Sequence, residues 1–313
     1  MKKHFSNIFV AGILLSAIFA SCERDNGKKY PEYPEIMQMS TNKSDVVTIQ
    51  LAGSEPATID WGDGSTRVTK ELSSYPNFTT FSHKYTATNE RIIKISGNNV
   101  TYLDCSNNQL TDLDVSNNKE LIFLRCYLNQ IRSLDVRNNT ALIELFCNDN
   151  RLMYLDVSKS TAIIDLNCSE NNLSSLNVSI NTALLSLSCS NNQLSDLDVS
   201  NNIILKILDC NMNRLPVLDV NSNTKLLHLY CGENRLSNLD VSNNTTLTKL
   251  TCNSNLLSED ALNTLFGTLH NNTVIQDMGG GGISTMKNIY IDDNPGTNRC
   301  NTNIALEKGW TIN

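Results

Sequence analysis

Apolar residues recur at a fixed spacing of 21 residues through the middle of the chain. Each of eight successive units places a leucine two residues before a cysteine and an asparagine three residues after it. Within each Leu-x-Cys segment the apolar positions alternate with variable ones, which is the period of a half-buried β-strand. The pattern therefore predicts eight short parallel strands stacked over residues 100–257. The cysteines of these units are Cys105, Cys126, Cys147, Cys168, Cys189, Cys210, Cys231 and Cys252.

The second half of each unit reads Leu-Asp-Val-Ser or a near variant, followed by a turn sequence such as Asn-Asn-Thr. This segment alternates as well, and a unit of 21 residues leaves little room for an α-helix on the return path. One unit cannot bury its own leucines, whereas stacked units form a continuous core. The sequence thus predicts a β-rich solenoid with a parallel concave sheet and a mostly extended convex side. The 44 asparagines follow this repeat and do not indicate low complexity.

The asparagine ladder from Asn108 to Asn255 is expected to satisfy backbone groups at the bend that follows each strand. The cysteines are expected to be free thiols in the core, because side chains stacked side by side lack the dihedral angle of a disulfide. Zinc sites need convergent ligands, whereas each unit supplies one thiol. We therefore predict no metal site.

The repeating unit L-x-x-L-x-C-x-x-N-x-L-x-x-L-D-V-S-x-N-T-x is the leucine-rich repeat pattern. Its length and its cysteine ladder resemble those of certain bacterial internalins and related surface lipoproteins. The resemblance covers Val100 to Leu257 and implies a right-handed solenoid. It also implies recognition of a host protein, but concave residues vary between members of the family, so no particular ligand carries over.

The first residues read as a secretion signal. Lys2 and Lys3 precede an apolar run that ends just before Cys22, and this junction resembles the lipobox of bacterial lipoproteins. The resemblance implies that residues 1–21 are a signal peptide and that Cys22 is the lipidated anchor. A plain signal peptide with an incidental cysteine is the alternative. Residues 22–45 are predicted to be a polar tether. Its acidic start resembles the export tags of Gram-negative surface lipoproteins, so we expect an outer-membrane protein at the cell surface.

Both ends of the solenoid are predicted to carry caps. Residues 46–99 predict short strands at 46–51, 57–60, 66–69, 79–85 and 91–96. Within them the run from Asp60 to Gly64, together with His83 and Tyr85, resembles the signature of PKD-like β-sandwiches, although about 50 residues are short for a complete sandwich. Residues 258–313 predict an α/β cap with an amphipathic helix from Ser258 and a degenerate ninth repeat from Ile289 to Asn294.

The strand period places the variable residues beside each leucine on the concave face. Aromatic residues gather on the first three strands around an arginine, and a smaller group lies near the other end. Aromatic residues with an arginine are common anchors of binding surfaces. The alternative is that the N-terminal cap folds over the first cluster. The predicted ligand-binding residues are Tyr102, Phe123, Arg125, Tyr127, Phe146, His228 and Tyr230.

Composition and motifs argue against several functions. A net charge of −7 provides no basic footprint for a nucleic acid. The histidines beyond the signal segment, His83, His228 and His270, stand in no nucleophile or metal spacing, and no phosphate-binding loop is present. We therefore predict a protein without enzymatic activity or cofactor that binds a protein or glycan through its concave face. A passive envelope or scaffold protein is the alternative.

Overall fold

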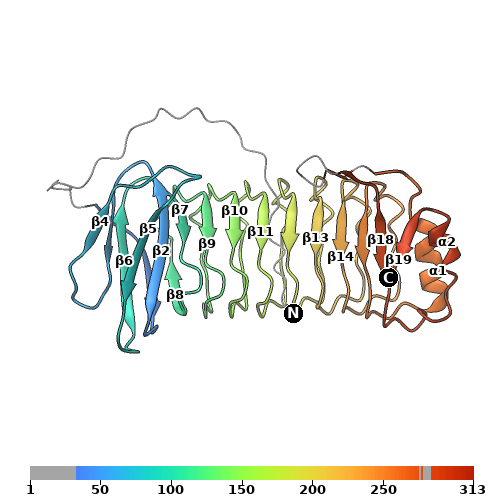
Figure 1. Cartoon of the computed structure of the whole chain (residues 1–313), viewed down its shortest axis with the longest axis horizontal. Helices are drawn as coiled ribbons and strands as arrows, with labels where there is room; N and C mark the ends of the chain where they lie inside the picture. Colours follow the sequence, from blue (N-terminus) through green and yellow to red (C-terminus); the bar gives the residue numbers. More distant parts are fainter. Residues whose placement is uncertain (1–32, 275, 278–282) are drawn as a thin grey trace. The chain divides into compact units, whose positions relative to one another are not determined.

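The leucine–cysteine segments form the centre of a twelve-stranded sheet in the computed structural model, which describes residues 33–274, 276–277 and 283–313. Neighbouring strands are parallel and in register, with Leu124 opposite Leu145 and Leu145 opposite Leu166 (Figure 1). The predicted solenoid is therefore confirmed. Its repeat strands, called rungs below, are β7 (Val100–Asp104), β9 (Phe123–Arg125), β10 (Glu144–Phe146), β11 (Asp165–Asn167), β12 (Ser186–Ser188), β13 (Ile207–Asp209), β14 (His228–Tyr230) and β15 (Lys249–Thr251).

The leucines and cysteines of the rungs form one continuous core. Leu145 and Cys147 are fully buried, as are their counterparts in every rung, while the residues that flank the leucine are half-buried in every rung from β9 to β15. The eight ladder cysteines are free thiols. Burial raises the pKa of thiols such as Cys147 well above its ordinary value. The thiols therefore stay protonated at neutral pH and act as small apolar core residues.

The asparagine ladder bonds each rung to the one before it, as the repeat predicts. The amide nitrogen of Asn171 donates to the carbonyl oxygens of Cys147 (3.0 Å) and Cys168 (3.1 Å). Its amide oxygen accepts from the backbone nitrogen of Leu152 at 2.9 Å. One side chain thus satisfies backbone groups of two neighbouring rungs that the bend leaves without a strand partner.

A second ladder lines the convex turns. Asn139 donates to the carbonyl oxygens of Val115 (2.9 Å) and Asn118 (2.7 Å), and the same pattern recurs at later turns. In the third unit Ser160 takes the place of the asparagine and donates to Asn139 at 3.2 Å. The aspartate of Leu-Asp-Val-Ser caps its own turn, since its carboxylate accepts from the backbone nitrogen two residues on, as Asp156 does from Ser158 at 2.9 Å. These recurring polar residues are therefore structural.

The residue before each ladder asparagine adopts a left-handed backbone conformation. Leu128 has a φ of 55° and Asn191 a φ of 50°, and the equivalent residue of every other rung is similar. Residues with a β-carbon rarely occupy this region, whereas asparagine tolerates it better than leucine. The bend imposes this conformation because the next residue must turn its amide toward the backbone of the preceding rung.

The prediction that residues 22–45 form a polar tether is wrong for part of this segment. Residues 35–41 form β1 (Glu35–Thr41), which lies between β6 (Arg91–Gly97) and β8 (Leu110–Asp114) in a five-stranded sheet. The strand forms because Met37 and Met39 alternate with polar residues and enter the core. The signal segment 1–21, Cys22 and the tether up to residue 32 lie outside the described residues.

The rest of the N-terminal cap follows the predicted strands. β2 (Val46–Gly53) pairs with β5 (Thr79–Lys84) on one side and with β7 on the other, both times antiparallel. The cap therefore continues the concave sheet. β3 (Ala57–Asp60) and β4 (Val68–Lys70) complete the five-stranded sheet, whose order is β4-β3-β6-β1-β8. The first rung is thus covered by paired strands and is not an open edge.

The residues that suggested a PKD-like signature hold two cap segments together. The Asp63 carboxylate lies 2.7 Å from His83 Nε2, and the His83 ring stacks on Trp61 with centroids 5.0 Å apart. The Tyr85 hydroxyl donates to the Trp61 carbonyl oxygen at 2.5 Å. Hydrogen bonds from Ser65 lower the pKa of Asp63 to about 2. Partial burial of the carboxyl opposes this effect, and the contact with His83 adds to it. These contacts fasten the turn after β3 to β5.

In its described residues, the C-terminal cap adds two helices, two further parallel strands and a pair of short antiparallel strands. α1 (Glu259–Thr268) begins after Ser258, whose side chain accepts from Ala261, and buries Leu262, Leu265 and Phe266. β18 (Lys287–Tyr290) pairs with β15 so that Ile289 faces Leu250, which makes it a ninth rung. The other cap elements are β16 (Gln276–Asp277), β17 (Ile283–Ser284), α2 (Asn303–Leu306) and β19 (Trp310–Ile312). No helix in the described part of the chain is long and apolar enough to cross a membrane.

Candidate binding face

The rungs present two rows of side chains on the open face of the sheet. The middle leucine of each short strand points into the core, so its two neighbours point outward. Along the sheet these outward residues change from aromatic at the first rungs to small and acidic at the centre, and then to aromatic and basic at the last rungs. The two rows are Tyr102, Phe123, Glu144, Asp165, Ser186, Ile207, His228, Lys249 and Asp104, Arg125, Phe146, Asn167, Ser188, Asp209, Tyr230, Thr251.

Tyr102 does not belong to the accessible surface. Its exposed fraction is 1%, because the loop between β4 and β5 folds over the first rung. The rings of Tyr75 and Phe78 lie 5.8 Å and 6.0 Å from the Tyr102 ring. The prediction that Tyr102 contacts a ligand is therefore wrong, and for this residue the alternative of a covering cap holds.

The same loop adds aromatic surface of its own. Tyr75 stacks on Phe123 with ring centroids 4.2 Å apart and an interplanar angle of 17°. Tyr75 and Phe78 are each 45% exposed. Phe123, Tyr127 and Phe146 are half-buried on the first rungs of the face. We call these five residues the aromatic end of the face.

Arg125 lies within the aromatic end, where it pairs with a carboxylate. Its Nε and Nη2 donate to the two carboxylate oxygens of Glu144 at 2.6 Å and 3.3 Å. The guanidinium carbon lies 5.4 Å from the ring centroid of Phe146 and 5.7 Å from that of Tyr102. Burial alone would lower the pKa of Arg125, but the hydrogen bonds and charge of Glu144 outweigh it and raise the pKa. Arg125 therefore joins Glu144 to the rings of Phe146 and Tyr102 and helps to hold these side chains in place.

The centre of the face carries two aspartates. Burial raises the pKa of Asp165 to about 6. A hydrogen bond with Ser186 and the charge of Arg125 oppose this rise, and the charge of Glu144 reinforces it. Burial likewise raises the pKa of Asp209, against hydrogen bonds with Asn211 and Ser190. Neither aspartate forms an ion pair within the described residues. Each carboxylate is therefore held by neutral donors only.

The far end of the face joins His228 and Tyr230 to two residues that are not among the predicted ligand-binding residues. The His228 and Tyr230 rings meet edge to face with centroids 6.1 Å apart. The Lys249 ammonium lies 5.1 Å from the Tyr230 ring and 5.7 Å from the ring of Tyr290, which comes from the ninth rung. Burial, with a smaller contribution from Lys249, lowers the pKa of His228, so the imidazole is neutral at pH 7.

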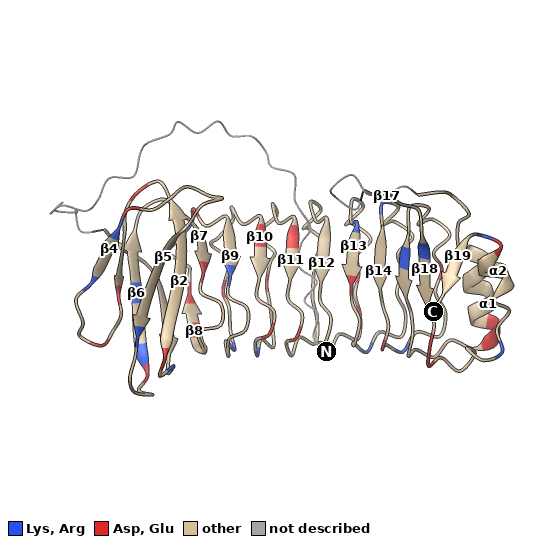
Figure 2. Ribbon diagram, in the orientation of Figure 1, with Lys and Arg blue, Asp and Glu red and all other residues tan. Residues whose placement is uncertain are grey.

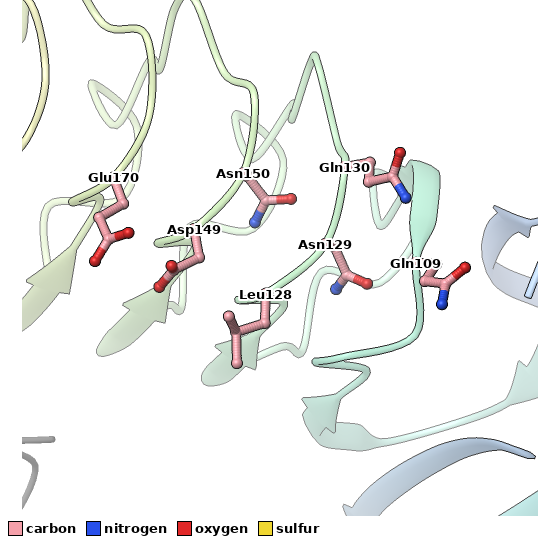
Figure 3. A pocket seen from close by; sticks show the side chains of 7 residues that line it. All are labelled: Gln109, Leu128, Asn129, Gln130, Asp149, Asn150 and Glu170. Atoms are coloured by element: carbon pink, nitrogen blue, oxygen red, sulfur yellow. The ribbon is translucent and has the colours of Figure 1, made fainter. Parts of the chain in front are cut away.

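A hollow of about 440 Å³ lies beside the face, along the bends that follow the rungs (Figure 3). Its wall includes Leu128, Asp149 and Glu170, which occupy the left-handed position of successive rungs. The amides of Gln109 and Gln130 complete the wall together with two ladder asparagines. A smaller hollow of about 310 Å³ adjoins Tyr75. The described residues contain no group of three or more side chains that could hold a metal ion.

Comparison with known proteins identifies the fold. No protein-family model and no curated protein matches the chain. Among solved structures it is similar to the functional domain of InlJ from Listeria monocytogenes, which includes a cysteine ladder, with 30% sequence identity and a TM-score of 0.51. This chain has an internalin-like leucine-rich repeat fold. The match covers 73% of this chain and 51% of that one.

A second internalin supports the same fold. InlF from Listeria monocytogenes is 22% identical over 67% of this chain and 57% of its own, with a TM-score of 0.52. The internalin-like chain thus spans little more than half the length of either solved structure. The predicted leucine-rich repeat architecture with a cysteine ladder is confirmed.

The missed surface residues of this internalin-like chain share one cause. Tyr75 and Phe78 lie in a loop, where no hydrophobic period reveals which way a side chain points. Lys249 stands in the predicted concave row but lacks an aromatic neighbour in its own strand. Only the pairing of β15 with β18 brings Tyr290 beside it. In each case the contact depends on how segments distant in the sequence pack together, which the local pattern does not report.

Proposed function

We propose that this chain is a protein-binding recognition module that contacts its partner through the concave face of the solenoid. The observation that carries the proposal is the aromatic end, where half-exposed rings from the cap loop and the first rungs stand side by side. Aromatic side chains provide large contact area at little cost in side-chain entropy, and they dominate the energetics of many interfaces.

The rigidity of the sheet that carries these rings favours a binding role over a purely structural one. Every rung is bonded to the next by strand pairing and by ladder asparagines, so the rings are held on a stiff surface. Surfaces that are rigid before binding lose less entropy when the partner arrives. Figure 1 shows this sheet running without interruption from the cap to the last rung.

The location of this module is part of the same proposal. The segment that ends at Cys22 supports a lipoprotein anchored in the outer membrane and displayed at the cell surface. The net charge of −7 supports a partner other than a nucleic acid. The resemblance to internalins supports a protein ligand over a glycan.

Comparative pull-down tests the proposal. The purified chain and its Phe123→Ala and Phe146→Ala variants are immobilised. They are then exposed to membrane and secreted proteins from cells that share the habitat of the organism that produces this chain. Tyr154→Ala is the matched control, because Tyr154 is 65% exposed and lies outside the concave strands. We expect one or more proteins to be retained by the wild type and by the control, but not by the concave variants.

Thermal unfolding of the same variants separates binding from packing. Leu145→Ala empties a fully buried position and should lower stability by about 2–5 kcal/mol. The Phe123 and Phe146 variants should lose much less. A loss equal to that of Leu145→Ala, or retention of the same proteins by every variant, would contradict binding at this face and favour a passive envelope protein.

A further inference from the structure

The concave face leaves room at its centre for side chains of a partner. The outward residues of β12 are both serines, Ser186 and Ser188, and Ser190 follows them. The rungs on either side carry Asp165 and Asp209 in outward positions. Adjacent strands lie about 4.8 Å apart, so these carboxylates lie on rungs separated by about 10 Å, with only small side chains between them. The centre is thus a gap in a row of otherwise larger groups.

Among the described residues, neither aspartate of this centre has a cation in direct contact, although the charge of Arg125 acts on Asp165 from a distance. Figure 2 shows acidic residues on β10, β11 and β13, a basic residue on β9 and another at the start of β13. The basic residue of β9, Arg125, is already bound to Glu144. Asp165 and Asp209 have hydrogen bonds to serine hydroxyls and backbone, and neither has an ion pair within the described part of the chain. Half-buried carboxylates without a direct cationic partner would gain free energy from a binding protein that supplies one.

Apolar contact surfaces lie at both ends of this acidic centre. Phe146 stands on β10 and Tyr230 on β14, four rungs apart, which corresponds to about 19 Å between strands. An extended polypeptide of about six residues covers that distance at about 3.3 Å per residue. A segment lying across the rungs would thus reach both ends with its side chains while passing over the aspartates.

We propose that the unpartnered concave sheet receives a cationic segment of a partner protein. Lysine or arginine side chains of this segment pair with Asp165 and Asp209, and apolar side chains about 19 Å apart contact the aromatic end and the His228–Tyr230 pair. This inference rests on the proposed function and adds the chemistry of the partner. Complementary charge selects the segment and speeds association, while the aromatic contacts supply most of the affinity.

A random 12-residue peptide library displayed on phage is the probe. The full chain is panned in parallel with the double variant Asp165→Asn/Asp209→Asn at low salt. We expect at least three-fold enrichment of lysine and arginine on the wild type and none on the double variant. Selected peptides, synthesised and measured by calorimetry, should bind at least ten-fold more weakly to the double variant and to the wild type in 0.5 M NaCl.

Matched variants keep the outcomes separate. Asp196→Asn removes an exposed carboxylate outside the concave strands and should leave peptide binding unchanged. Melting of the Asn variants at or above the wild-type temperature shows that they are folded. Neutral or acidic selected peptides, or equal affinity for the double variant, would overturn the inference. If those peptides still lose affinity on Phe146→Ala, the proposed function stands; if no concave variant affects them, both proposals fail.

Discussion

Asn171 is the side chain whose removal tests the ladder most simply. Its amide oxygen is the partner of the Leu152 backbone nitrogen, at 2.9 Å, and its amide nitrogen reaches the carbonyl oxygens of Cys147, Cys168 and Ser169. The Asn171→Ala change removes all four bonds at a position where the side chain is 8% exposed. Water cannot readily replace them there.

The expected loss follows from counting which groups lose their last partner. The Cys147 carbonyl keeps a bond from Asn150 at 3.1 Å, and the Cys168 carbonyl keeps one from Asn192 at 3.0 Å. Only the Leu152 nitrogen is left without a partner. An orphaned buried N–H costs about 1–3 kcal/mol, and the lost donor bonds add about 1 kcal/mol. We therefore expect Asn171→Ala to lower the free energy of unfolding by about 2–4 kcal/mol.

Urea unfolding followed by circular dichroism measures this loss, with Asn172→Ala as the matched control. Asn172 is the next residue, is exposed, and should change stability by less than about 0.5 kcal/mol. Equal slopes of the unfolding transitions show that the comparison is valid, because repeat arrays can unfold in parts. If Asn171→Ala and Asn172→Ala unfold at the same urea concentration, the account of the ladder is refuted.

Three further predictions concern other parts of the fold. Burial raises the pKa of Asp165 from 3.8 to about 6, so the ionised carboxylate destabilises the folded state fully above pH 6 and not at all below pH 4. Asp165→Asn should therefore raise Tm at pH 7.5 but not at pH 3.5. An equal gain in Tm at both pH values would argue against burial as the cause. Leu128→Gly should stabilise the chain by about 1 kcal/mol in chemical denaturation by relieving a φ of 55°, whereas Asn191→Gly should change little; equal effects would contradict the strain argument. All eight ladder thiols should resist alkylation in the folded chain and react after denaturation without reductant, as mass spectrometry can show; a consistent disulfide between neighbouring rungs would disprove the free-thiol core.

The sequence predicts most of the fold because the repeat reports burial directly. Leu145 and Cys147 are apolar in every equivalent unit, and a strand period is the only arrangement that buries both. β1 is missed because its apolar residues follow a polar, proline-containing stretch and find their partners in β6 and β8, far along the chain. The covering of Tyr102 by Tyr75 is missed for a similar reason, since contacts between a loop and a sheet leave no periodic signal.

The candidate site is therefore only partly predictable. Strand alternation places Arg125 and Glu144 on the same face. Whether they form an ion pair depends on the lateral spacing of β9 and β10. The same spacing decides that Asp165 has a serine beside it in place of a cation. Local patterns determine which residues face outward, and the packing of neighbouring rungs determines what each of them contacts.

Photo-crosslinking on living cells tests the central claim most directly. Benzoylphenylalanine is introduced in place of Phe123 or Phe146 on the concave face, and in place of Tyr154 outside it, in cells that produce the full chain. Recognition through the concave face predicts discrete adducts with a second protein from the first two positions and none from the third. Adducts from Tyr154 alone, or no protein adduct from either concave position, would contradict the claim.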